Sequence, residues 1–108
     1  MKIQREPSFS VRICIAGNRQ TAANICRHFC YDIGCCVTLE DAEYIYTGGQ
    51  ESGVVVGLIN YPRFPQPPEN IIEIATNLGM KLMNGLYQQS FTIVTPVETI
   101  WFSRRPEQ

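Results

Sequence analysis

The spacing of apolar residues along the chain constrains its fold more than any other feature. Residues 8–16 alternate apolar and polar side chains, which is the period of a β-strand. In residues 22–33 the apolar side chains recur every three to four positions, as on one face of an α-helix. The same reasoning predicts two more strands, a second helix and two final strands, at residues 35–47, 54–61, 69–86, 90–95 and 99–103.

Residues between these stretches are typical of strand breaks and helix caps. Gly17-Asn18 ends the first strand, and Asn18 or Thr21 is suited to cap the helix that follows. Gly34 is placed as a helix C-cap. Glu40-Asp41 predicts a bulge or a bend in the second strand, and residues 48–53 predict the loop of a β-hairpin.

The second helix is expected to open at Pro67-Pro68, because proline is tolerated in a first helical turn. Glu69 would then lie near the positive end of the helix dipole. Gly79 falls within the apolar stripe, where glycine lowers helix stability by about 1 kcal/mol. Close packing of this helix on the sheet would account for the glycine.

The element order predicts an α+β fold with a two-layer βαββαβ arrangement, resembling a split βαβ unit, and a short extra C-terminal strand. We expect one domain over residues 1–108, with an antiparallel sheet and both helices on one face. Residues 54–59 are apolar on both sides of the strand, so the second face of the sheet needs a cover. This predicts a homo-oligomer in which a partner copy of the chain covers that face, or else a bound ligand.

Charge and hydropathy restrict the partners. A net charge of −1 and a pI near 5.8 argue against binding to duplex nucleic acid, which requires a basic surface. No apolar run approaches the ~20 residues needed to span a bilayer. The first seven residues are polar and lack the apolar core of a signal peptide. We therefore expect a cytoplasmic protein with no membrane partner.

Five cysteines lie in the first third of the chain, at positions 14, 26, 30, 35 and 36. An odd number crowded into one region is unlike a secreted disulfide scaffold. Their spacing is weak evidence for zinc, even with His28 as a further ligand, so buried free thiols are the preferred interpretation and no metal is expected.

Few residues suit catalysis. His28 is the single histidine, and no GxSxG, HExxH or P-loop pattern is present. The acidic residues Glu40, Asp41 and Glu43 are interpreted as a solvated edge. Cys35 or Cys36 supported by His28 is the one enzymatic alternative. We otherwise expect no catalytic residue and no cofactor.

Residues suited to ligand binding are more numerous, and the first group follows the third strand. Pro62 and Pro65 hold the chain extended around Arg63, with Tyr61 and Phe64 on either side of it. An arginine between two aromatics suits a flat anionic ligand such as a nucleotide. Asn60 adds an amide that can read a base or a ribose. Alternatively, this stretch is a plain strand-to-helix connection with Phe64 tucked under the second helix.

The C-terminal strand supplies the second group. Trp101 offers an aromatic face, and Arg104 and Arg105 offer guanidinium groups that match phosphate oxygens. Strand alternation requires only one of Trp101 and Phe102 to be buried, and the sequence leaves open which one. The alternative is an arginine tail that serves solubility.

The string YTGGQESGVVVGLINYPRFP, followed by a helix and then SFTIV and WFSRR, resembles small proteins of phages and prophages. Length, element order and the arginine-bearing last strand are similar to the Thoeris anti-defence sponge family of phages. This resemblance implies a homo-oligomer, a dimer or an assembly of dimers, that sequesters cyclic ADP-ribose-type immune signals without cleaving them. For a phage protein the expected location is the cytoplasm of the host cell. The resemblance also implies a second site for cyclic oligonucleotides, at which Arg12 and His28 are the matching residue types.

The leading hypothesis is therefore a non-enzymatic protein that binds and sequesters a nucleotide-like immune signal and so counters host defence. An alternative is a protein–protein inhibitor or adaptor that docks through residues 61–65, since proline fixes a peptide in a low-entropy extended form. The third hypothesis is the small cysteine–histidine enzyme.

Overall fold

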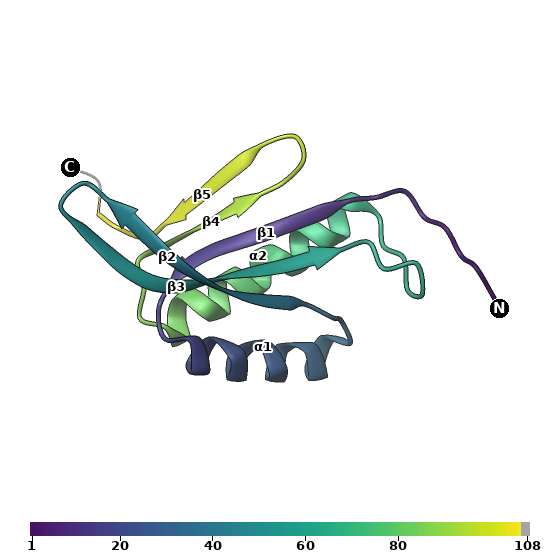
Figure 1. The fold of residues 1–108 in the computed structure, drawn as a ribbon, viewed down its shortest axis with the longest axis horizontal. Coiled ribbons are helices and arrows are strands. Elements are labelled where there is room, and N and C mark those ends of the chain that lie inside the picture. The colour runs from purple at the N-terminus through teal and green to yellow at the C-terminus, as the bar shows by residue number, and fades with distance from the viewer. Residues whose placement is uncertain (107–108) are drawn as a thin grey trace.

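A computed structural model describes residues 1–106 and confirms the expected α+β order of elements (Figure 1). The elements are β1 (Ser10–Ala16), α1 (Arg19–Ile33), β2 (Thr38–Tyr46), β3 (Gly49–Ile59), α2 (Pro68–Gly85), β4 (Ser90–Val94) and β5 (Thr99–Ser103). None of the helices within residues 1–106 is long and apolar enough to cross a membrane.

The five strands form one antiparallel sheet in the order β2-β3-β1-β4-β5. Both helices lie on the same face of this sheet, as Figure 1 shows. Strand β1 is central, with Ile13 opposite Val56 of β3 and Ile93 of β4. Because paired residues share a face, these three side chains all point toward the helices and are fully buried.

The core fills the space between the sheet and the two helices. The strands contribute Val11, Ile13, Ile15, Val54, Val56, Leu58, Phe91 and Ile93. The helices contribute Ala22, Cys26, Phe29, Ile71, Ala75, Leu78, Leu82 and Met83. A Cβ added at Gly79 would lie only 2.7 Å from Cζ of Phe91. Close packing of α2 on the sheet therefore explains the glycine in this helix.

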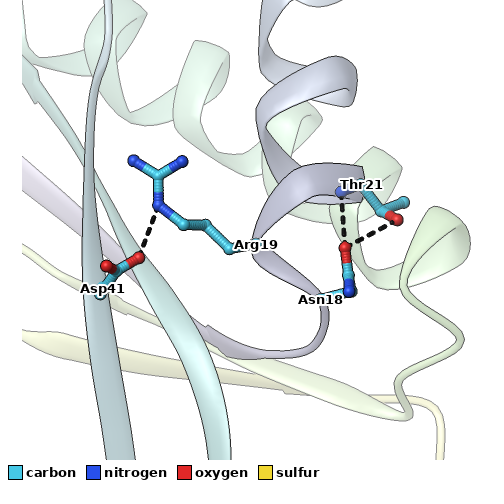
Figure 2. A network of polar contacts seen from close by, with 4 residues as sticks. All are labelled: Asn18, Arg19, Thr21 and Asp41. Carbon is cyan, nitrogen blue, oxygen red and sulfur yellow. Dashed lines mark hydrogen bonds and ion pairs between the residues drawn. The ribbon is translucent and has the colours of Figure 1, made fainter.

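Helix α1 has the two caps that the sequence indicates. The side chain of Asn18 accepts a hydrogen bond from the backbone N–H of Thr21 at 2.9 Å (Figure 2). Gly34 adopts the left-handed conformation, with φ of 78°, and its N–H donates to the carbonyl of Cys30. The apolar face stops short of the helix end, because Ile33 is 54% exposed.

The β2–β3 hairpin differs from the prediction. The pairing is continuous from Thr38–Gly57 to Tyr46–Gly49, without a bulge at Glu40-Asp41. These acids are tolerated in a regular ladder because β2 is an edge strand on which both are exposed. The loop contracts to a tight turn at Thr47-Gly48, where Gly48 has φ of 88°, so much of the predicted loop is strand.

The second face of the sheet is uncovered by any helix of residues 1–106. It carries the alternate side chains of β1 and β3, among them Arg12, Cys14 and Val55. Ile59 and Trp101 on this face are 48% and 64% exposed. Strand β3 therefore carries apolar side chains on the open face as well as on the helix face, as the sequence predicts. That a second copy covers this face stays a prediction.

Candidate functional site

The β2–β3 hairpin concentrates carboxylates and tyrosines on two paired strands. Its polar and aromatic residues are Glu40, Asp41, Glu43, Tyr44, Tyr46, Glu51 and Ser52. Strand alternation places Glu40, Tyr44 and Tyr46 on the open face of the sheet, and Asp41 and Glu43 on the face that carries α1. The hairpin therefore presents acids on both sides.

Tyr44 is held flat on the open face by the residue beside it. Its ring lies over Gly53, where an added Cβ would be 2.7 Å from a ring carbon. The hydroxyl donates to the backbone carbonyl of Val54 at 2.7 Å. Burial, and then the neighbouring Cys14 thiol, raises the pKa of Tyr44 to about 12. The phenol therefore stays protonated at neutral pH and acts as a fixed aromatic wall.

Two carboxylates of the hairpin are oriented by hydroxyl groups. Tyr46 donates to Oε1 of Glu51 at 3.2 Å, and Ser52 donates to Oε1 of Glu43 at 3.2 Å. Each contact fixes one carboxylate oxygen, and the other oxygen is free of these contacts. Exposed carboxylates positioned in this way are suited to a cationic ligand that carries N–H or O–H donors.

A cleft of about 400 Å³ adjoins the acids at the start of α1. It is lined by Gly17, Asn18, Arg19, Asp41, Ala42, Glu43, Ser52 and Gly53. Figure 2 shows Arg19 reaching across it to Asp41, with Nε 2.6 Å from Oδ1. Both side chains are more than half exposed, at 53% and 76%, so this ion pair contributes little to stability. We refer to this cleft, with the eight lining residues just named, as the acidic cleft.

The acidic cleft combines one guanidinium group with two carboxylates, those of Asp41 and Glu43, whereas Tyr44, Tyr46 and Glu51 lie on the opposite face of the hairpin. Such a set is suited to a ligand that carries cationic groups. The lining of the cleft includes no thiol and no histidine. Among residues 1–106 no group of three or more histidine, cysteine or acidic side chains is arranged to hold a metal ion.

The residues predicted from the segment after β3 lie at the other end of the sheet. Asn60 donates to the carbonyl of Pro7 at 2.9 Å and accepts from the N–H of Gln66 at 2.9 Å. Its amide thus joins the N-terminal segment to the proline-rich connection. The Asn60 side chain, which the sequence predicts to bind a ligand, is therefore engaged in two hydrogen bonds within the chain.

Tyr61 and Phe64 form an aromatic pair with ring centroids 5.5 Å apart. Together with residues of α2 and Cys35-Cys36 they line a small pocket of about 100 Å³. A hydrogen bond with Cys36 is the main cause that raises the pKa of Tyr61. Phe64 lines this pocket beside residues of α2 but is 43% exposed, so it is not tucked under the helix, and Arg63 between the two aromatics is also exposed.

The C-terminal residues take different positions from one another. Phe102 points to the core and stacks on Phe91 with centroids 4.7 Å apart, so Trp101 is the exposed aromatic. Arg104 donates to Oδ1 of Asn84 at 2.5 Å and to the carbonyl of Gln88 at 2.9 Å. Arg105 is exposed beside it. The strand register places Ser103, the last residue of β5, at one end of the sheet and Asn60 at the other end. Within one chain, the predicted ligand-binding residues after β3 therefore lie far from those at the C-terminus.

The residues proposed for other sites are also separated. Arg12 lies on the open face, opposite Gly57 and Val94, whereas His28 lies on α1 on the other side of the sheet. One chain therefore does not bring Arg12 and His28 together. His28 lines a cleft with Asp32 and Lys81, while Cys35 and Cys36 line the Tyr61 pocket. This separation gives no support to a cysteine–histidine pair.

Comparison with known proteins yields structural neighbours only. No protein-family model matches the sequence, and no curated protein is significantly similar to it. A solved phage SAM lyase in its apo state superposes with a TM-score of 0.77 over 100% of both chains, at 15% identity. A phage SAM lyase in complex with S-methyl-5'-thioadenosine superposes with a TM-score of 0.67 at 14% identity, over 100% of this chain and 98% of that one.

These neighbours correct the leading functional hypothesis. Both are phage proteins, which agrees with the broader part of the resemblance noted from the sequence, and one binds a small nucleoside. Both are lyases, however, which contradicts the predictions of a non-enzymatic protein and of a sponge for cyclic ADP-ribose-type signals. Those predictions, and the adaptor alternative that accompanied them, are wrong on this finding.

Proposed function

We propose that this chain is a lyase that cleaves S-adenosylmethionine (SAM) and releases S-methyl-5'-thioadenosine. The observation that carries the proposal is the full-length superposition on phage SAM lyases, one of them holding S-methyl-5'-thioadenosine. The acidic cleft gives separate support, because SAM carries a sulfonium and an ammonium, and the carboxylate of Glu43 lines the cleft outside the Arg19–Asp41 ion pair.

The cleavage of SAM does not require a nucleophile or a general base from the protein. Its sulfonium is already a good leaving group, and its own carboxylate can reach the carbon bonded to sulfur. Attack of a carboxylate oxygen on that carbon breaks the carbon–sulfur bond, and the bonding pair leaves with sulfur as S-methyl-5'-thioadenosine. The remainder closes to homoserine lactone, and no water or proton is consumed. The protein then needs to hold one folded conformation of the substrate.

Charge changes during this step indicate which contacts help. The sulfonium and the carboxylate neutralise each other as the new bond forms, so a carboxylate placed directly on sulfur would stabilise the substrate more than the transition state. We therefore assign Glu43, which lines the cleft on the α1 face of the hairpin, to the ammonium or to a ribose hydroxyl of SAM.

Arg19 is assigned a supporting role. A guanidinium bound to the substrate carboxylate would lower the nucleophilicity of that group. Arg19 is already paired with Asp41 at 2.6 Å, and we propose that it stays so while substrate is bound. The pair then keeps the charge of Asp41 balanced at the mouth of the cleft.

The test is product formation from SAM by the purified protein, followed by liquid chromatography and mass spectrometry. SAM decays slowly by itself, so each rate is measured against a protein-free blank. Glu43→Gln should lower kcat/KM by roughly 10- to 100-fold, the loss of one charge-assisted contact, whereas Glu51→Gln, on the opposite face of the hairpin, should leave kcat/KM unchanged. Glu98→Gln, the same change in the turn between β4 and β5, is the matched control and should leave kcat/KM unchanged.

A wild-type rate equal to the blank, for protein that circular dichroism shows to be folded, would refute the lyase function. If wild type cleaves SAM and Glu43→Gln is as active as wild type, the lyase function stands and the assignment of its site to the acidic cleft is wrong.

A further inference from the structure

Four of the five cysteines gather where α1 ends and the chain leads into β2. They are Cys26, Cys30, Cys35 and Cys36, and all are free thiols. The thiol of Cys35 donates to the sulfur of Cys30, with the two Sγ atoms 3.7 Å apart. This cluster lies at the end of α1 away from the acidic cleft, and the proposed lyase chemistry makes no use of it.

The backbone at this point already holds the two residues together. The left-handed Gly34 reverses the chain, so that the N–H groups of Gly34 and Cys35 reach the carbonyl of Cys30 at 2.8 and 3.4 Å. A disulfide requires the two residues to lie close together with their side chains directed at each other, and the two Sγ atoms here already approach to 3.7 Å. Rotation of the two side chains is then enough to bring the sulfurs into bonding distance.

We propose that Cys30 and Cys35 are a redox-active pair that is reversibly oxidised to a disulfide by a low-molecular-weight disulfide such as glutathione disulfide. The Cys30 thiolate attacks one sulfur of the oxidant and releases one equivalent of its thiol form. Cys35 then attacks the Cys30 sulfur of the mixed disulfide and releases the second equivalent. Two protein thiols lose two electrons and two protons in total, and the small disulfide gains them.

The surroundings decide the order of these steps. Burial, and then the hydrogen bond with Cys30, raises the pKa of Cys35 to about 12, so Cys35 is a thiol at neutral pH. Its S–H points at the Cys30 sulfur, 3.7 Å away. Burial likewise raises the pKa of Cys26 to about 11, which removes it as a competitor. Cys36 is exposed but donates to the hydroxyl of Tyr61 at 3.3 Å, away from the pair.

Oxidation would change the wall of the Tyr61 pocket. Cys35 lines this pocket together with Tyr61 and Phe64, whereas Cys30 belongs to α1. A bond between them ties the segment that precedes β2 to the last turn of the helix. We therefore expect slower amide exchange over residues 30–36 in the oxidised form.

The test equilibrates native full-length protein with glutathione redox buffers and maps disulfides by mass spectrometry. Trypsin cleaves after Arg27 and next after Arg63, so a Cys30–Cys35 bond lies within one peptide, whereas any bond to Cys26 links two. Chymotrypsin, which cleaves at Tyr31, then separates the two halves of the proposed bond. Cys35 and Cys36 stay on one fragment, so digestion alone does not show which of them is bonded to Cys30. The variants Cys35→Ser and Cys36→Ser distinguish the two possibilities.

We expect the Cys30–Cys35 bond to form in wild type, in Cys14→Ser and in Cys36→Ser. We expect it to be absent from Cys30→Ser and from Cys35→Ser, both of which should keep a native circular dichroism spectrum. Loss of the bond in Cys36→Ser, a bond to Cys26, or a wild type that stays fully reduced in glutathione disulfide alone would overturn the proposal. None of these readouts depends on SAM cleavage.

Discussion

Gly53 is the position at which the sheet and the acidic cleft depend most directly on a missing side chain. A Cβ at this position would overlap the carbonyl oxygen of Ile15 and lie 2.7 Å from Cα of Ala16 and from a ring carbon of Tyr44. Two of these three atoms are backbone atoms of the paired strand β1, which cannot rotate away. We therefore predict that Gly53→Ala is strongly destabilising.

The expected loss follows from three terms. Overpacking against fixed backbone costs about 1–3 kcal/mol. Displacement of the end of β1 also weakens the hydrogen bond from the N–H of Gly17 to the carbonyl of Ser52, 2.9 Å long, which is worth about 1 kcal/mol. Alanine also lowers the conformational entropy of the unfolded chain, which offsets the loss of folding stability by roughly 0.4–1 kcal/mol. The net loss is about 2–3 kcal/mol, or roughly 10–20 °C in Tm for a chain of this size.

Gly57→Ala is the matched control, since Gly57 lies on the same strand and the same face. Its Cβ would meet only Oγ1 of Thr38, at 2.5 Å, and that exposed side chain can rotate away. Urea denaturation followed by far-ultraviolet circular dichroism should place Gly57→Ala within about 1 kcal/mol of wild type. Equal losses in the two variants would refute the argument, because packing against β1 and Tyr44 would then not be the cause.

Two further predictions concern other positions. Burial raises the pKa of Tyr44 from 10.0 to about 12, so the folded chain holds this proton more tightly and its contribution to stability is lost as pH rises from 10 through 12. Chemical denaturation at pH 9 and at pH 11 should show a smaller fall in stability for Tyr44→Phe than for wild type; an identical fall would contradict this. Arg104→Ala should lower stability by about 1–2 kcal/mol, because its guanidinium joins β5 to Asn84 and Gln88. An unchanged urea midpoint, with Arg105→Ala as control, would show that these hydrogen bonds contribute nothing.

Much of the fold could be predicted because the local signals agree with the tertiary structure. Alternation in residues 8–16 identified the central strand, and Asn18 and Gly34 marked both ends of α1. The hairpin boundaries were less accurate. Glycines and acids suggested a loop and a bulge, but an exposed edge strand tolerates both residue types in a regular ladder.

The candidate site was harder to predict because it depends on pairing across the hairpin. Glu43 and Ser52 are nine residues apart in the chain, and only the register of β2 with β3 places them together. The acids were therefore interpreted as a solvated edge. Conversely, Arg63 and Arg104 are equally suited to anions by residue type, yet the sheet separates them and Arg104 bonds to α2 and the residues after it.

The inference from a thin set of catalytic residues to a non-enzymatic protein failed for a chemical reason. It assumed that catalysis requires a nucleophile, a base or a metal from the protein. SAM supplies both the nucleophile and the leaving group, so a site can accelerate its cleavage by conformation and charge alone. Such a site has no short motif that a sequence can reveal.

The most direct test of the account is the fate of oxygen when the protein cleaves SAM in heavy-oxygen water. The account predicts S-methyl-5'-thioadenosine together with homoserine lactone whose ring oxygen is unlabelled, since that oxygen comes from the substrate carboxylate. Release of S-methyl-5'-thioadenosine with label at the carbon that was bonded to sulfur would instead show attack by water. Labelled product of that kind, or no product above the protein-free blank, would contradict the assignment of this fold as a SAM lyase.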